Sequence, residues 1–330
     1  MEILRVENLV MHYDLDGRGW VRAVDNVSFT LDKGMCVGIV GESGCGKSSL
    51  GLTILRLLPY NGVIKKGEIL LDGENILAVP EERFRKEIRW KRISMIFQGA
   101  MNALNPLFTV GDQIAEAILV HERTSKRKAL RRARELLEMV GIDPERVKSY
   151  PFELSGGMKQ RVVIAMALAL NPEVLIADEP TTALDVMVQA RILHLIKRLQ
   201  RELGLSLIFI SHDVSVIAQM ANYVAIMYAG KFVEYGRIED VFLRPRHPYT
   251  YLLLKAVPDV KGKPRRLEGI PGAPPDLADP PTGCRFHPRC PFATEKCKKI
   301  DPNPQEVDNM HLVACVRADE IKDELGEITW

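Results

Sequence analysis

A glycine-rich loop that ends in a lysine and a serine constrains the fold of this 330-residue chain more than any other feature. The loop, residues 41–48, follows the short apolar run 37–40 and fits the pattern Gly-x-x-x-x-Gly-Lys-Ser completely. Such a loop joins a buried strand to a helix, so the pattern predicts an α/β fold. Its backbone N–H groups would surround phosphates, Lys47 would reach the outer ones, and the Ser48 hydroxyl would ligate magnesium. The alternatives are a chance glycine turn and nucleotide binding without hydrolysis.

A second glycine site lies at residues 154–160, Leu-Ser-Gly-Gly-Met-Lys-Gln. Ser155, followed by Gly156 and Gly157, opens an apolar helix and so offers a capping hydroxyl and unshielded backbone N–H groups to an anion. The phosphate loop already supplies this chain with one anion site. We therefore predict that the second site completes the nucleotide site of another subunit, so that two subunits close on one nucleotide across a dimer.

Two further apolar runs, residues 174–177 and 207–210, predict buried strands. Ligands of such sheets bind at the carboxyl ends of the strands, which is where Asp178 and His212 fall. Asp178 suits the magnesium shell, and Glu179 can act as the general base for in-line attack of water on a γ-phosphate. An Asp-Glu pair is common on protein surfaces, but its place after a strand, in a chain with a phosphate loop, favours the catalytic interpretation.

Charge and hydropathy limit the classes of partner. The formal net charge is only +2, with acidic and basic residues interspersed, so charge does not indicate a nucleic-acid-binding surface. No apolar run approaches the roughly 20 residues needed to cross a bilayer, and the N-terminus lacks the layout of a signal peptide. We expect a cytoplasmic protein whose contact with a membrane goes through a partner.

A change in hydropathy pattern and proline content along the chain predicts two domains. Residues 1–242 alternate apolar runs with helical patterns and include a helix-rich section at about residues 109–170. Within that section, the basic stretch 125–140 predicts an exposed helix with one packed face, formed by Leu130, Ala133, Leu136, Leu137 and Val140. Residues 243–330 are Pro-rich, and we expect them to form a separate tail domain with little regular structure.

Together these motifs resemble the nucleotide-binding subunit of an ABC transporter, in the expected order from Tyr13 to His212. The resemblance implies an ABC-type nucleotide-binding domain in residues 1–242, with a RecA-like core, an antiparallel β subdomain and a helical subdomain. It implies that Gln98 touches magnesium and couples to membrane subunits, that Asp185 lies in the D-loop, and that His212 contacts the γ-phosphate. Tyr13 resembles the aromatic residue that stacks on adenine, with Trp20 as its rival. The implied nucleotide contacts are Tyr13, Gly41, Glu42, Ser43, Gly44, Cys45, Gly46, Lys47, Ser48, Ser49, Gln98, Ser155, Gly156, Gly157 and Asp185, with Ser48, Gln98 and Asp178 at magnesium and Glu179 and His212 in catalysis.

The C-terminal tail indicates which group of ABC transporter subunits the chain resembles. Residues 246–250, Arg-His-Pro-Tyr-Thr, resemble the C-terminal extension of ATPase subunits from oligopeptide and dipeptide importers. Four cysteines follow: Cys284, Cys290, Cys297 and Cys315.

In a reducing compartment four such thiols are better suited to a metal centre than to disulfides. The Cys-x-x-Cys knuckles typical of zinc sites are absent. The wider spacing and the resemblance together favour a four-iron four-sulfur cluster, with zinc or unligated thiols as alternatives and His287 and His311 as substitute ligands. We expect a structural role rather than redox sensing, so that Cys284→Ser destabilises the tail and leaves nucleotide binding by the core intact.

The function implied by the resemblance is that of the ATP-hydrolysing subunit of a binding-protein-dependent importer for di- or oligopeptides, with oligosaccharides and nickel as alternative substrates. Its partners would be a second, different ATPase subunit, two transmembrane permease subunits and, indirectly, an extracytoplasmic binding protein. It would lie peripherally on the cytoplasmic face of the membrane. The competing interpretations are an ABC ATPase of DNA repair or translation, which typically has two ATPase domains or a long coiled-coil insertion, and a regulatory iron–sulfur protein that binds nucleotide.

Overall fold

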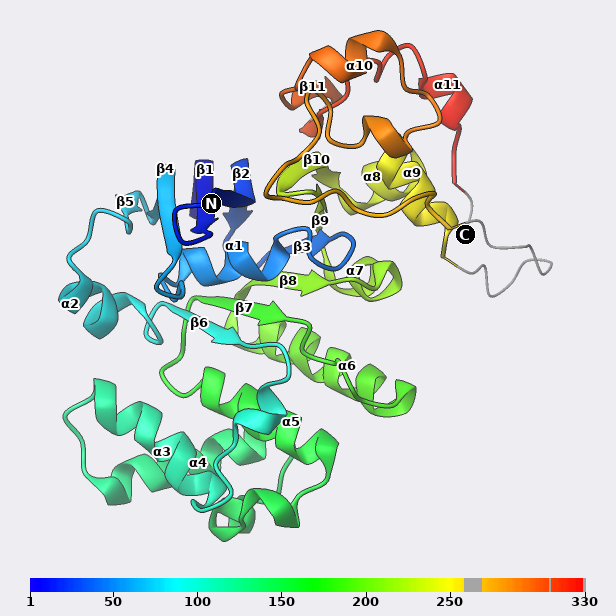
Figure 1. The fold of residues 1–330 in the computed structure, drawn as a ribbon. Coiled ribbons are helices and arrows are strands. Elements are labelled where there is room, and N and C mark those ends of the chain that lie inside the picture. The colour runs from blue at the N-terminus through cyan, green and yellow to red at the C-terminus, as the bar shows by residue number, and fades with distance from the viewer. Residues whose placement is uncertain (258–268, 309, 329–330) are drawn as a thin grey trace. The chain divides into compact units, whose positions relative to one another are not determined.

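The computed structural model describes residues 1–257, 269–308 and 310–328 (Figure 1). They form two compact units, each assembled from segments that are far apart in the sequence. The unit that we call the helical unit consists of Met1, Leu31–Met35 and Ala78–Phe209. The unit that we call the phosphate-loop unit consists of Glu2–Thr30, Cys36–Leu77 and the described residues within Ile210–Trp330.

An antiparallel sheet of four strands, in the order β2-β1-β4-β5, builds one part of the phosphate-loop unit. The strands β1 and β4 pair along most of their length, with Leu4 opposite Leu71. Apolar residues at alternate positions, such as Leu4 and Val6, are buried, as expected for strands with one face on a core. The strands are β1 (Glu2–Asp14), β2 (Trp20–Asp32), β4 (Gly62–Leu71) and β5 (Glu74–Asn75).

A second set of strands in this unit runs in the order β11-β12-β10-β9-β3. The fully buried β3 is parallel to β9, with Val37 opposite Tyr223, and β12 pairs antiparallel with β10, with Val313 opposite Glu234. The tail, expected to hold little regular structure, thus adds two strands to this set, because β10 offers β12 a pairing edge and β11 pairs with β12. The strands are β3 (Cys36–Val40), β9 (Tyr223–Tyr228), β10 (Lys231–Arg237), β11 (Gln305–Asp308) and β12 (His311–Val313).

Six α-helices belong to the described part of the phosphate-loop unit. The first, α1, begins directly after the glycine loop that leaves β3. Their bounds are α1 (Lys47–Ile54), α7 (Val214–Met220), α8 (Ile238–Leu243), α9 (Pro248–Lys255), α10 (Glu295–Lys299) and α11 (Lys322–Leu325).

Three neighbouring strands of the helical unit lead along the chain to predicted site residues, namely Gln98, Asp178 with Glu179, and His212. The last two residues of the third strand, Ile210 and Ser211, already belong to the phosphate-loop unit. The strands β6 and β7 are parallel, and β8 lies next to β7. Their bounds are β6 (Ile93–Ile96), β7 (Val174–Asp178) and β8 (Ser206–Ser211), and the helices of the unit are α2 (Glu81–Arg83), α3 (Val110–His121), α4 (Lys126–Met139), α5 (Gly156–Ala167) and α6 (Val186–Leu203).

The predicted basic amphipathic helix is confirmed as α4. Ser125 caps its N-terminus, and Ala133, Leu136 and Leu137 are buried as expected. Leu130 is only half-buried, and Ala129 takes the corresponding place on the packed face. Among the residues that the structure describes, no helix has the length and apolar character needed to cross a bilayer.

Candidate functional site

The phosphate loop has a backbone that only glycine can adopt at its most crowded position. Gly46, which precedes α1, has φ 110° and ψ 2°, and Gly44 has φ 79°. A Cβ atom on Gly46 would lie 2.0 Å from the carbonyl oxygen of Ala23, whereas one on Gly44 would meet no atom within 4 Å. The loop conformation therefore depends on glycine at position 46 for both space and backbone geometry.

Lys47 is held inside its own loop. Its side chain is buried, and Nζ donates to the carbonyl oxygens of Gly41, at 2.7 Å, and of Glu42, at 2.9 Å. Burial raises the pKa of the adjacent Cys45 thiol, so this thiol is neutral. A fixed ammonium beside the N-terminus of α1 makes this part of the unit attractive to an anion.

The two aromatic candidates for adenine stacking differ in their surroundings. The Tyr13 hydroxyl donates to Oγ of Ser49 at 3.0 Å, so Tyr13 lies beside the first turn of α1. The ring of Trp20 carries the ammonium of Lys65, with Nζ 3.3 Å from the ring centroid. Tyr13 is thus the candidate that lies next to the phosphate loop, and adenine stacking stays a prediction.

In the helical unit, the end of β7 brings three predicted residues together. Asp178 is the buried last residue of the strand, and Glu179 follows with φ 46°, a left-handed conformation that is uncommon for glutamate. One oxygen of Glu179, Oε2, accepts hydrogen bonds from Nε2 of Gln98 at 3.1 Å and from Oγ1 of Thr182 at 3.0 Å. Local backbone geometry and two donors therefore fix the direction of this carboxylate.

The second glycine site opens α5, as the sequence predicts. Ser155 caps the helix and accepts a backbone N–H at 3.4 Å, while Ser155 and Gly156 are exposed. A Cβ on Gly157 would lie 2.8 Å from Cγ1 of Val188. Asp185 caps α6 and accepts the N–H of Val188 at 2.9 Å. Gly157 therefore allows α5 to lie close to the first turn of α6.

The predicted site residues divide between the two units. The phosphate-loop unit holds Tyr13, residues 41–49 and the exposed His212, which comes directly after β8. The helical unit holds Gln98, Ser155, Gly156, Gly157, Asp178, Glu179 and Asp185.

The four tail cysteines line one pocket, together with His247, His287 and Arg317. They are free thiols. Burial raises the pKa of Cys290 to about 11 and that of Cys315 to about 12, which favours neutral thiols.

No group of three or more His, Cys, Asp or Glu side chains in the described part of the chain is arranged to hold a metal ion. The predicted four-iron four-sulfur cluster is therefore not supported by the geometry, and neither is the zinc alternative. His311, considered as a substitute ligand, is instead buried against Glu234, with 2.7 Å between Nε2 and Oε1.

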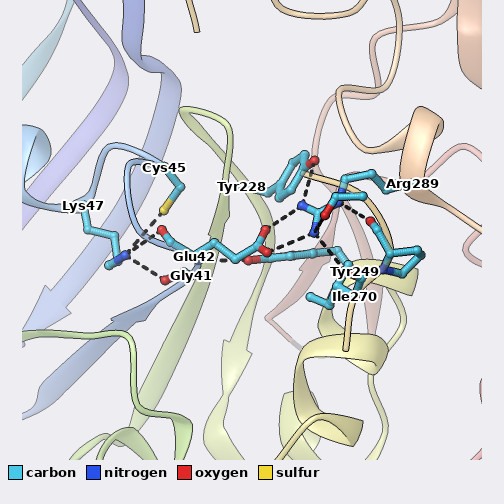
Figure 2. A network of polar contacts seen from close by, with 10 residues as sticks. Gly41, Glu42, Cys45, Lys47, Tyr228, Tyr249, Ile270 and Arg289 are labelled. Atoms are coloured by element: carbon cyan, nitrogen blue, oxygen red, sulfur yellow. Dashed lines mark hydrogen bonds and ion pairs between the residues drawn. The ribbon is translucent and has the colours of Figure 1, made fainter. Parts of the chain in front are cut away.

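Sequence reasoning missed two tail residues that contact the phosphate loop. The guanidinium of Arg289 makes an ion pair with the Glu42 carboxylate at 2.6 Å, and the backbone N–H of Glu42 donates to the Tyr249 hydroxyl at 3.0 Å (Figure 2). The signal in the sequence was Glu42 itself, since a carboxylate within an anion-binding loop calls for a compensating charge.

Two family models match the chain. The model described as ABC transporter matches residues 24–182, and the model described as oligopeptide/dipeptide transporter, C-terminal region, matches residues 233–297.

Curated relatives match over nearly the full length. The chain is 48% identical to the dipeptide transport ATP-binding protein DppD of Bacillus subtilis, over 97% of this chain and 96% of that protein. It is also 48% identical to the oligopeptide transport ATP-binding protein OppD of the same organism, over 94% of this chain and 87% of that protein.

Solved structures match the fold. The dimeric structure of MJ0796, described as a bacterial ABC transporter cassette, has a TM-score of 0.63 and 29% identity, and the match covers 72% of this chain and 99% of that one. A structure of cbiO1 from Clostridium perfringens, part of the ABC transporter complex cbiONQ, also has a TM-score of 0.63 with 28% identity, and covers 73% of this chain and 90% of that one. The fold is thus that of an ABC ATPase cassette, and the chain belongs to the ATP-binding proteins of ABC transporters, in the group that carries the oligopeptide/dipeptide transporter C-terminal region.

Proposed function

We propose that this chain hydrolyses MgATP and thereby powers the import of peptides through an ABC transporter. The observation that carries the proposal is the fixed orientation of the Glu179 carboxylate. Glu179 follows the buried Asp178 and accepts hydrogen bonds from Gln98 and Thr182. Family membership supplies the reaction, and the dipeptide and oligopeptide transport relatives support the substrate class.

The phosphate loop would bind the triphosphate. Lys47 would exchange the carbonyl oxygens of Gly41 and Glu42 for phosphate oxygens, which are stronger acceptors because they are charged. Ser48, Gln98 and Asp178 carry the oxygen ligands that suit magnesium, which when bound neutralises charge on the β- and γ-phosphates.

Glu179 would act as the general base for hydrolysis. The water oxygen bonds to the γ-phosphorus while the bond from that phosphorus to the β,γ-bridging oxygen breaks, and the water proton passes to Glu179. The products are ADP and inorganic phosphate. His212 would donate to the γ-phosphate oxygens, and Tyr13 would stack on the adenine.

We further propose that two ATPase subunits close head to tail. The exposed Ser155 and Gly156 at the start of α5, with Gly157, would bind the γ-phosphate held by the other subunit, and Asp185 would lie nearby in that interface. The dimeric structure of the similar cassette MJ0796 supports such an assembly. The second subunit would be a different ATPase, and the pair would contact two permease subunits at the cytoplasmic face of the membrane, coupled indirectly to an extracytoplasmic binding protein.

We propose that the ABC ATPase domain comprises residues 1–242 and that residues 243–330 form a C-terminal extension. In this extension we propose an iron–sulfur cluster on Cys284, Cys290, Cys297 and Cys315. What supports the cluster is that the four thiols line one pocket, although their present arrangement is not that of ligands. Iron and sulfide analysis of anaerobically purified protein, with its visible absorption spectrum, tests this proposal. Four irons per chain would support it, stoichiometric zinc would favour the alternative, and absence of both metals would refute it.

The experiment for the main proposal measures ATP hydrolysis by the full chain, alone and with its permease and partner ATPase subunits in proteoliposomes. We expect hydrolysis that rises when the membrane subunits are present and rises again when the binding protein is loaded with peptide. Hydrolysis that ignores the membrane subunits would refute the transport function, and stimulation by an oligosaccharide or nickel instead of peptide would refute the substrate class.

A further inference from the structure

The phosphate loop carries a carboxylate that a tail arginine neutralises. The Arg289 guanidinium forms a bidentate ion pair with the Glu42 carboxylate, with Nη1 2.6 Å from Oε2 and Nη2 3.0 Å from Oε1 (Figure 2). Only 5% of the Arg289 side chain and 26% of the Glu42 side chain are exposed. The two residues are 247 positions apart in the chain, yet both belong to the phosphate-loop unit.

Hydrogen bonds to groups other than Glu42 hold the Arg289 side chain in place. Its Nε donates to the carbonyl oxygen of Pro271 at 2.7 Å, and Nη1 also donates to the Tyr228 hydroxyl at 3.3 Å. The guanidinium is charged, because arginine does not lose its proton in proteins. A fixed, charged fork of this kind sets the position of the carboxylate it binds.

A second tail residue holds the backbone at the same position. The Tyr249 hydroxyl accepts the N–H of Glu42 at 3.0 Å, and burial raises the pKa of Tyr249 well above its usual value. The Tyr249 ring packs on Tyr228, with 4.6 Å between centroids, and on Phe286, with 5.3 Å. Side chain and backbone of Glu42 are therefore both bound by the tail.

The tail also reaches the phosphate loop near Cys45, through the turn at Ala229 and Gly230 that joins β9 to β10. Arg285 hydrogen-bonds to the carbonyl oxygen of Ala229 and pairs with Asp25. The next residue, Gly230, donates its N–H to the carbonyl oxygen of Cys45 at 2.8 Å. Arg285 and Arg289 lie next to Cys284 and Cys290 in the sequence, so the cysteine segment and the phosphate loop form one connected structure.

We propose that Arg289 is a positioning residue of the phosphate loop, which neutralises and restrains Glu42 so that the loop can accept a nucleoside triphosphate. This inference rests on the proposed function. Without Arg289, an unpaired carboxylate would lie in a loop that must bind the negative charges of ATP, and the two would repel each other. With it, the pair contributes no net charge and the loop keeps its shape.

The tail then contributes to nucleotide binding by the phosphate loop. Because binding couplings are reciprocal, ATP that favours the ordered loop also favours the docked tail, and loss of the tail weakens ATP binding. The contacts therefore argue against our expectation that Cys284→Ser leaves nucleotide binding intact.

The test is a double-mutant cycle on the full chain. MgATP affinity would be measured calorimetrically for the wild type, Arg289→Met, Glu42→Gln and the double variant. The charge of the pair is zero in the wild type and the double variant, negative in Arg289→Met and positive in Glu42→Gln. We expect ATP affinity about tenfold weaker in Arg289→Met and restored to within about threefold of wild type in the double variant, with Glu42→Gln as the fourth member of the cycle.

The matched control is Arg317→Met. Arg317 is a tail arginine that lines the cysteine pocket and pairs with Glu320 at 2.8 Å, a partner outside the phosphate loop. A charge effect also predicts that the deficit of Arg289→Met is larger for ATP than for ADP and shrinks as salt rises.

Three outcomes would overturn the inference. These are wild-type affinity in Arg289→Met, an equal loss in Arg317→Met, and failure of Glu42→Gln to restore binding to Arg289→Met, which would mean that only the stability of the tail had changed. A wild type that binds no ATP would instead refute the proposed function, so the two failures are distinguishable.

Discussion

Replacing Gly46 with alanine tests the structural account of the phosphate loop quantitatively. Two costs are expected in the folded protein. Holding alanine at φ 110° costs about 1–2 kcal/mol, as for left-handed backbone in general. The new Cβ would lie 2.0 Å from the carbonyl oxygen of Ala23 on β2, so strand or loop must shift, at a further cost of about 1–3 kcal/mol.

Gly44→Ala is the matched control within the same loop. Gly44 also has a positive φ, of 79°, but a Cβ there would meet no atom within 4 Å. It should therefore lose only the backbone part, about 1–2 kcal/mol, against about 2–5 kcal/mol for Gly46→Ala.

The assay is urea unfolding of both full-length variants, followed by MgATP titration under native conditions. We expect Gly46→Ala to be the less stable variant and to lose ATP affinity as the loop shifts. Equal losses of unfolding free energy in the two variants would show that the contact with Ala23 does not constrain the loop.

Three further predictions concern the helical unit and the tail. Gly157→Ala should lower steady-state ATP hydrolysis with ATP binding retained, because the new Cβ would lie 2.8 Å from Cγ1 of Val188. Adding Val188→Ala should restore hydrolysis, and failure of this rescue would contradict the importance of the contact. Gln98→Ala removes a donor to Glu179 and should slow steady-state hydrolysis about tenfold; an unchanged rate would contradict the positioning argument. Cys284→Ser should lower both the thermal stability of the tail and MgATP affinity, and unchanged affinity in a destabilised tail would contradict the coupling of tail and loop.

Local patterns sufficed to predict the elements that hold the site residues. The phosphate loop, the strand before Asp178 and the helix caps Ser155 and Asp185 each depend on a few neighbouring residues, so their sequence carries the signal. The contact of Gln98 with Glu179 was not visible in this way, since it joins positions 81 apart. The resemblance to a family supplied that grouping.

The role of the tail could not be predicted because it depends on contacts between distant segments. Nothing near Arg289 indicates that its partner is Glu42, and nothing near β12 indicates that it pairs with β10. The four cysteines show the same limit in another way. The fold brings all four to one pocket, but their spacing in the sequence does not determine whether the thiols are arranged as metal ligands.

The central claim, that Glu179 is the base for ATP hydrolysis, is tested most directly by comparing turnover and ATP affinity in Glu179→Gln. Glutamine can still accept from Gln98 and Thr182 but cannot take a proton from water. We expect a loss of turnover of about 10²–10⁴-fold, the usual contribution of a general base, with MgATP affinity retained. Near-normal turnover in this variant would contradict it.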